Sequence, residues 1–434
     1  MTDQVKMIKI PRQTAFLKMP KEDVEKYLKE VESHFGKAWL ETQAGHRLQI
    51  LWERSDSNST IDLVSLGYAL KTISERHPEW LKGCVGDILS DDPKRQNGAL
   101  FELNLIAWFI NGGMNVLPAS YGEKGIDATL KFQAADDLFI SMKNHDMSHH
   151  EQTLHQNCER IRNKARDLCK KQGCRGITVT LTSKEYLSSD SDWRAIEKAV
   201  EEWPALKSVV EERQVIPGIH LFVGQLGASK ENLDAGFISD SFAVFMPYHK
   251  NEQPNFKQKL NDAITQLKQK CADKTGKKAV FMRLHQTANM PEMTEFATEL
   301  ISEEGCAADL IVLYQPAYIN NQNLDQTSPS QYFSFIRSPG WEDQKYPIKM
   351  QAAVAVHIQN PSKQKMIWPD GSLRDPLKDH YMYYVGQHFV ATQMDQHGKG
   401  TANIQRRPNL SIYPVFQGHI VAGLLPPNDE FLVL

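Results

Sequence analysis

The stretch from Gly98 to Lys143 constrains the fold most, because an amphipathic helix is followed there by three short strand-like runs. A capping residue and a proline at Asp92-Pro93 start the helix, and its apolar residues recur at helical spacing up to a glycine pair at 112–113. The strand-like runs then occupy residues 114–118, 125–132 and 138–143. This order predicts a helix that packs on the sheet formed directly after it.

Three ionisable residues stand at defined points of this stretch. Glu102 lies in the helix about one turn from Leu105, where a helix that only packs would carry an apolar residue. Asp127 and Lys143 lie in neighbouring strand-like runs. A single lysine at a strand end is usually a solvated edge charge. The three together, in this order, predict a functional site.

The segments that follow continue the alternation of helices and strands. A basic helix over 151–172 and a strand over 176–182 complete the order αβββαβ. The strand, helix and strand over 241–284 echo those over 138–182, including the basic helix, and we interpret this second half as a surface rather than a second active site. The predicted fold class is α/β, with a mixed central sheet flanked by helices.

Four regions are predicted along the chain. The N-terminal region is mainly helical, although GHRLQILWER, at 45–54, alternates as a strand would. A polar, loop-like stretch over 318–331 is predicted to open a C-terminal region that is rich in strands. The predicted regions are the helical residues 1–92, a core over 93–185, an α/β extension over 186–317 and the β-rich residues 318–434.

Composition limits the function classes only loosely. The net charge of −3 neither requires nor excludes nucleic acid as a partner. The six cysteines form no CxxC pair, which favours free thiols in a reducing compartment over a zinc site or disulfide framework. No signal-peptide pattern opens the chain and no run reaches ~18 apolar residues, so we expect a cytoplasmic protein without a membrane segment. Neither GxxxxGK[ST] nor GxGxxG occurs.

The order αβββαβ together with Glu102, Asp127 and Lys143 resembles the PD-(D/E)XK nuclease superfamily, which has the restriction-endonuclease-like fold, and in particular its Mrr-like members. The resemblance covers residues 93–183. It implies a metal-dependent nuclease that hydrolyses DNA phosphodiester bonds, as restriction and anti-phage defence effectors do. By this resemblance Asp127 is the main ligand of Mg²⁺ or Mn²⁺, and Glu102 is a second ligand. Lys143 would orient the attacking water or offset charge that develops on the phosphate.

One position departs from the family pattern. Ser141 stands where the family usually has Glu or Gln two residues before the lysine. In a subset of restriction enzymes the acid has moved to the following helix, and Glu159 is the candidate here. Alternatively Glu159 pairs with Arg162 on a solvated face, catalysis is lost, and the protein is a degenerate nuclease-like subunit that binds nucleic acid or serves as a scaffold.

The predicted basic helix is the candidate surface for nucleic acid. Its stripe of Lys and Arg fits contacts to a duplex backbone, although a solvated helix face would have the same composition. We expect DNA as the partner, without separating it from RNA, and a homo-oligomer, most simply a dimer that cuts two strands. The candidate nucleic-acid contacts are Ser141, His145, Arg160, Arg162, Arg166 and Lys170.

Overall fold

The computed structural model describes most of the chain up to residue 352 and short segments beyond it. The described ranges are 19–42, 45–54, 57–120, 125–225, 239–285, 288–321, 326–352, 357–359, 366–367, 373–374, 379–385, 391–394, 400–404, 410–412 and 422–424. Structural statements below refer to these residues.

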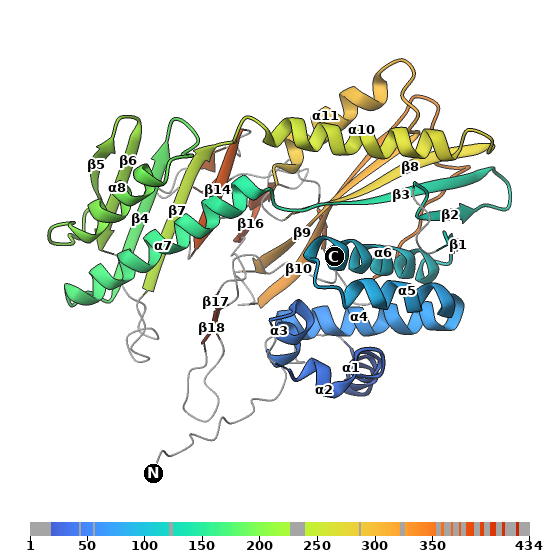
Figure 1. Cartoon of the computed structure of the whole chain (residues 1–434), viewed down its shortest axis with the longest axis horizontal. Helices are drawn as coiled ribbons and strands as arrows, with labels where there is room; N and C mark the ends of the chain where they lie inside the picture. Colours follow the sequence, from blue (N-terminus) through green and yellow to red (C-terminus); the bar gives the residue numbers. More distant parts are fainter. Residues whose placement is uncertain are drawn as a thin grey trace, which may run out of the picture.

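A mixed sheet, sheet A, forms the centre of the molecule (Figure 1). Its order is β1-β2-β3-β8-β9-β10-β11, and β16 connects β15 to β9. The first three strands are antiparallel neighbours, whereas β3, β8 and β9 run parallel. The strands are β1 Asn115–Pro118, β2 Ala128–Lys131, β3 Asp137–His145, β8 Gly276–Leu284, β9 Leu310–Asn321, β10 Gln326–Arg337, β11 His357–Gln359, β15 Ala391–Met394 and β16 Gly400–Ile404.

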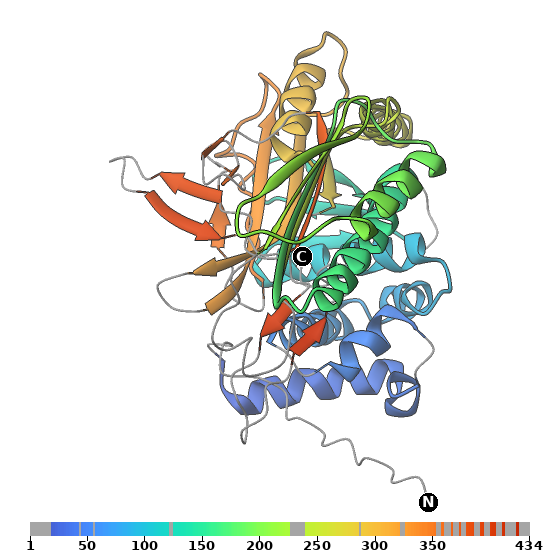
Figure 2. The same ribbon diagram turned by 90° about the vertical axis from the view of Figure 1, so that its left-hand side faces the viewer.

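Helices cover both faces of sheet A, so the molecule is layered here. The N-terminal helices lie at the bottom of both views in Figures 1 and 2 and share one apolar cluster with sheet A. Two later helices share a second cluster with its other face. The helices are α1 Lys21–Phe35, α2 Lys37–Leu40, α3 Arg47–Glu53, α4 Ser57–Arg76, α5 Pro78–Ile88 and α6 Pro93–Asn111 on one side, and α10 Glu252–Lys270 and α11 Met290–Ser302 on the other.

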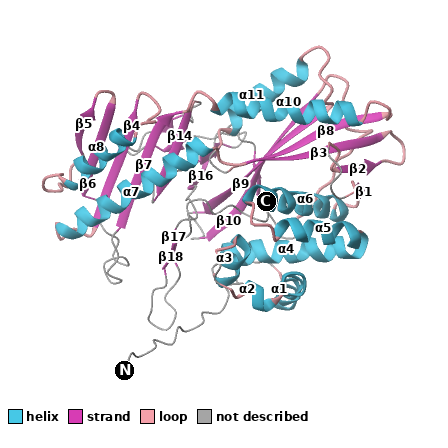
Figure 3. Ribbon diagram, viewed as in Figure 1, coloured by secondary structure: helices cyan, strands magenta, loops and turns pink. Residues whose placement is uncertain are grey.

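A second mixed sheet, sheet B, stands beside sheet A (Figure 3). Its order is β14-β7-β4-β6-β5, and two helices share its apolar cluster. All of its elements except β14 come from the chain between β3 and α10. The elements are α7 His149–Lys171, β4 Gly176–Ser183, α8 Asp190–Glu201, β5 Glu211–Ile216, β6 Ile219–Gln225, β7 Ser239–Pro247 and β14 His380–Val385.

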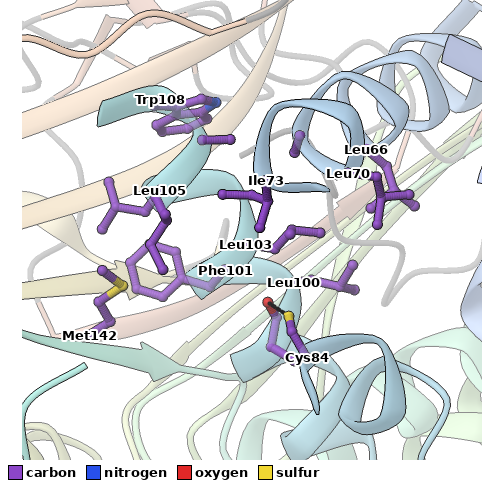
Figure 4. Close-up of a cluster of buried hydrophobic side chains, with 14 of the residues drawn as sticks. Leu66, Leu70, Ile73, Cys84, Leu100, Phe101, Leu103, Leu105, Trp108 and Met142 are labelled. Atoms are coloured by element: carbon purple, nitrogen blue, oxygen red, sulfur yellow. Dashed lines mark hydrogen bonds between the residues drawn. The ribbon is translucent and has the colours of Figure 1, made fainter. Parts of the chain in front are cut away.

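Helix α6 is fixed against β3 by apolar side chains. The Asp92 side chain accepts a hydrogen bond from the Lys94 N–H at 2.9 Å and starts the helix as expected. Further along, Leu105 and Trp108 of α6 lie in one cluster with Met142 of β3 (Figure 4). Burial of each such side chain stabilises the fold by about 1.5–3 kcal/mol. The position of α6 relative to β3 is therefore set by the core.

The expected α/β class, with mixed sheets flanked by helices, is confirmed. The grouping of residues 93–185 into one unit is corrected, because α7 and β4 belong to sheet B. Beside β3 lies β8 instead, which pairs with it in parallel from Asp137 and Gly276 to His145 and Leu284. The order αβββαβ around β3 is made by α6, β1, β2, β3, α10 and β8.

Two local predictions were wrong. Residues 45–54 contain helix α3 rather than a strand, because the His46 ring accepts the Leu48 N–H and the Gln49 side chain accepts the His46 N–H. This capping box starts a helix. The apolar residues of the segment had been interpreted as alternating with the two-residue period of a strand. Residues 318–331 lie largely in β9 and β10, which form an antiparallel pair, rather than in a loop.

Much of the region after residue 352 lies outside the described residues, and with it about half of the predicted β-rich region. The described segments there include two short antiparallel pairs. These are β12 Met366–Ile367 with β13 Leu373–Arg374, and β17 Leu410–Ile412 with β18 Ala422–Leu424. Among the helices of the described ranges, none combines the length and apolar character needed to cross a membrane.

The contact between α1 and α4 allows a direct test of the helical layer. A Cβ atom added at Gly67 would lie 2.0 Å from the Tyr27 carbonyl oxygen, so the two backbones would have to separate. Gly67→Ala should therefore lower the free energy of unfolding by about 1–3 kcal/mol, measured by urea denaturation. The control is Gly86→Ala in α5, where no described atom lies within 4 Å and a gain of about 0.5–1 kcal/mol is expected. Equal effects of the two changes would contradict the close packing.

Candidate active site

Asp127 lies where β2 separates from β3. The two strands pair from Ala128 and Ile140 to Leu130 and Leu138. Just before β2, the Asp127 N–H donates to the Ile140 carbonyl at 2.8 Å, and the Asp127 carboxylate accepts the Met142 N–H at 2.5 Å. The Asp127 side chain thus accepts the hydrogen bond that a neighbouring strand would otherwise accept from Met142.

Ser141 and Lys143 point to the same side of β3, because alternate residues of a strand share a face. The Ser141 hydroxyl and the Lys143 Nζ both lie 3.3 Å from Asp127 Oδ2. Only 13% of the Asp127 side chain and 24% of the Lys143 side chain are exposed, so this ion pair is largely shielded from water. Ser141 itself is fully buried. The pair is held in place but is open to solvent on one side.

Glu102 approaches the same group from α6. Its side chain is half-buried, and its pKa is raised to about 8. Burial is the main cause, the negative charge of Asp127 adds to it, and the positive charge of Lys143 opposes it, with a smaller upward contribution from Asp87. The charges of Asp127 and Lys143 act on Glu102 only because the three side chains are near each other. The structure therefore brings Asp127, Ser141 and Lys143 into contact, with Glu102 of α6 within range of the charges of Asp127 and Lys143.

Asp127 and Glu102 are the residues of this group that could hold a magnesium ion, and such an ion would keep most of its own water. Two carboxylates, Asp127 and Glu102, converge, and a divalent cation between them would relieve the repulsion that raises the pKa of Glu102. Among the described residues, no group of three or more His, Cys, Asp or Glu side chains is arranged to hold a metal. Mg²⁺ is commonly bound through one or two carboxylates, with water and substrate oxygens completing the shell.

A polar network surrounds the end of β3 next to this group. The Asp146 carboxylate accepts hydrogen bonds from the side-chain amides of Asn144, at 2.7 Å, and Asn97 of α6, at 3.2 Å. The Asn144 side-chain oxygen accepts from Arg283 of β8 at 3.1 Å, and Lys259 of α10 donates to the Asn144 carbonyl. The network ties α6, α10 and β8 to β3 beside Lys143.

His145 is buried instead of facing substrate. Its ring packs edge-on against Phe256 of α10, with 5.3 Å between ring centroids. Burial, helped by the positive charge of Lys259 and by His285, lowers the pKa of His145 to about 3, so the ring is neutral. The expected phosphate contact by His145 is therefore corrected.

Glu159 does not join the Asp127 group. It lies on α7, which packs on sheet B, where its carboxylate accepts a hydrogen bond from the Tyr383 hydroxyl of β14. Its second oxygen lies 3.4 Å from Arg162, the pairing expected if the acid had not moved. Glu159 thus holds α7 against sheet B and leaves position 141 without a substitute on that helix.

Several basic residues of α7 are paired with acids. Arg160 lies 2.6 Å from Glu197 of α8, and Lys164 pairs with Glu201 of the same helix. Arg162 is buried beside Glu159. Arg166 is half-buried, and Lys170 is exposed with Asp167 at 3.6 Å. Two residues of the predicted stripe, Arg160 and Lys164, therefore join α7 to α8, and two others, Arg162 and Lys170, pair with acids of α7 itself.

Sequence reasoning missed Lys259, Asn97 and Asn144 as members of the site region. The available signal was the echo of strand, basic helix and strand over 241–284, since Lys259 lies on that second basic helix. Comparison of the chain with protein-family models, with curated protein sequences and with solved structures gave no match. Functional arguments therefore rest on the residues of this chain.

The raised pKa of Glu102 predicts a stability change with a defined pH dependence. A carboxyl group whose pKa is higher in the folded state destabilises the fold as pH rises from its unfolded value, about 4.3, to its folded value. With metal removed by EDTA, Glu102→Gln should raise the free energy of unfolding near pH 8 by about 1–3 kcal/mol. Near pH 4 the difference should vanish.

The measurement is thermal or urea unfolding at both pH values. Glu185→Gln, at an exposed carboxyl group, is the control and should change stability little at either pH. A Glu102→Gln effect of the same size at both pH values would show that the carboxyl group is not destabilised by burial and by Asp127.

Proposed function

We propose that this protein is a metal-dependent nuclease that hydrolyses phosphodiester bonds of DNA. The observation that carries the proposal is the convergence of Glu102, Asp127 and Lys143, from one helix and two neighbouring strands, at the point where β2 leaves β3. Two acids and a lysine at one open edge suit a phosphate and a divalent cation together. In this role two copies would cut the two strands of a duplex, as restriction or anti-phage effectors do.

The residues have separate parts in the proposed reaction. Asp127 and Glu102 would hold Mg²⁺ or Mn²⁺, which supplies neutralising charge and lowers the pKa of water. Lys143, fixed 3.3 Å from Asp127, would hold the attacking water or stabilise negative charge on the phosphate. The Met142 N–H and the Ser141 hydroxyl donate to the Asp127 carboxylate and fix its orientation, so that it need not rotate when a metal binds.

The resemblance to the PD-(D/E)XK superfamily supports this proposal in a revised form. The order αβββαβ is retained when α10 and β8 take the places first given to α7 and β4. The parallel pairing of β3 with β8 puts the Lys143 strand inside the sheet. Sheet B is then an insertion between β3 and α10.

One observation favours a second candidate, a nuclease-like protein that binds nucleic acid or acts as a scaffold without cutting it. Ser141 is fully buried and offers no carboxylate, and Glu159 is engaged with Tyr383 and Arg162 on sheet B. A metal would then have only Asp127 and Glu102. Measured cleavage separates this candidate from the nuclease.

Cleavage of plasmid and linear DNA in Mg²⁺ or Mn²⁺ tests the proposal. Asp127→Asn and Lys143→Gln should each reduce the cleavage rate by about a hundredfold or more, because a ligand or a charge-stabilising cation is lost. The matched controls are Lys131→Gln and Asp137→Asn, which alter an ion pair between the same two strands away from the site.

The controls should remain within about twofold of the native rate, since a surface ion pair contributes little to stability. Cleavage that survives both site substitutions would reject the assigned residues. Absence of cleavage together with binding of DNA would favour the second candidate.

A further inference from the structure

Helix α6 presents a stripe of three residues at the site, of which Glu102 is only the last. Lys94, Gly98 and Glu102 are spaced four residues apart and therefore lie on one face of the helix. Asn97, beside this stripe, donates to Asp146 directly after β3, which holds this part of α6 against the strand end. The stripe thus extends from the Asp127 group toward the end of β3.

Gly98 leaves the middle of this stripe open. A Cβ atom added there would meet no atom of the described residues within 4 Å. Glycine inside a helix costs about 1 kcal/mol relative to alanine, and no close backbone contact at Gly98 offsets that cost. By comparison, Gly67 is required by the backbone of Tyr27. Packing therefore does not require a glycine at position 98, one turn before Glu102.

Lys259 approaches the same region from α10, on the other side of β3 in Figure 1. Its Nζ donates to the Asn144 carbonyl. The pKa of Lys259 is lowered by burial and, to a smaller extent, by the positive charges of Lys94 and Lys143, while Asp146 opposes these effects. Lys94 of α6 and Lys143 of β3 therefore each lie within range of the charge of Lys259 on α10.

Acids of the described residues lie beside these lysines. Asp146 is the acid that acts on Lys259, and its carboxylate already accepts the amides of Asn97 and Asn144. Glu102, the last residue of the stripe, and Asp127 beside it are the proposed metal ligands. An anion placed over Gly98 would reduce the repulsion among the lysines and would meet no side chain from α6.

We propose that the open face of α6 over Gly98, between Lys94 and Lys259, binds the phosphate next to the scissile phosphate of a polynucleotide. This subsite rests on the proposed nuclease function, because it takes its place from the Glu102, Asp127 and Lys143 group. It assigns a substrate-binding role to α6 and α10 and fixes the direction in which the strand leaves the site, along α6 toward its N-terminal end.

A steric block at Gly98 tests the subsite. Gly98→Gln places a side chain in the open space and improves helix propensity, so the variant should fold. Binding of a fluorescent DNA duplex, measured in Ca²⁺ with the Asp127→Asn background and without it, should weaken by about tenfold. Gly86→Gln is the matched control, because Gly86 is also a helical glycine without described neighbours within 4 Å, and it should bind as the native protein does.

The charge at Lys259 gives an independent readout. Lys259→Gln should weaken duplex binding and reduce the slope of log affinity against log salt by about 0.9, the value for one lost phosphate contact. Lys268→Gln, on the same helix but exposed, is the control and should leave the slope unchanged. Circular dichroism and unfolding curves of all four variants verify that they fold.

The outcomes separate the subsite from the nuclease. If Gly98→Gln matches Gly86→Gln while Asp127-dependent cleavage is present, the subsite is wrong and the nuclease stands. If the protein does not cleave DNA but Gly98→Gln and Lys259→Gln weaken binding as expected, the subsite stands and the nuclease fails. A native protein that binds no DNA, or a Lys259→Gln variant with an unchanged salt slope, overturns the subsite.

Discussion

The structure depends on an edge of β3 that has no strand partner among the described residues. Beyond Ile140, β2 no longer pairs with β3, and backbone groups of Met142 and Asn144 face the vacated side. A backbone N–H or carbonyl left without a partner costs free energy, so side chains take the missing bonds. Asp127 accepts the Met142 N–H and Lys259 donates to the Asn144 carbonyl. The same requirement that completes the strand thus brings charged groups to one place.

Sequence reasoning found the acidic and basic centre of the site because its signals are local. Glu102 is polar within an apolar helix, Asp127 directly precedes β2, and Lys143 lies in β3, the next strand. Antiparallel neighbours are usually consecutive in sequence, so the expected proximity held. The prediction of the helix and strand that follow β3 in the fold was wrong. Both α7 with β4 and α10 with β8 fit the pattern of a basic helix followed by a strand, and only the long-range pairing of β3 with β8 distinguishes them.

The pairing of Glu159 and of the basic residues of α7 within the protein has one physical origin. Charge along a helix predicts a solvated or ligand-binding face only if no other element covers it. Here α8 supplies Glu197 and Glu201 opposite α7, and β14, from far along the chain, supplies Tyr383. These partners are distant in sequence, so the composition of α7 alone does not indicate whether its charges are paired within the protein.

The insertion of sheet B has a mechanical consequence. Two of its chain connections are the end of β3, which carries Lys143, and the start of α10, which carries Lys259, while β14 joins the sheet from a later part of the chain. The rings of His150 and His249 stack between these two connections with 3.5 Å between their centroids, and the Tyr381 hydroxyl of β14 donates to Glu252 at the start of α10. The end of β3 and the start of α10 are therefore linked both through sheet A and at the border of sheet B, so that a displacement of sheet B would move these two segments together.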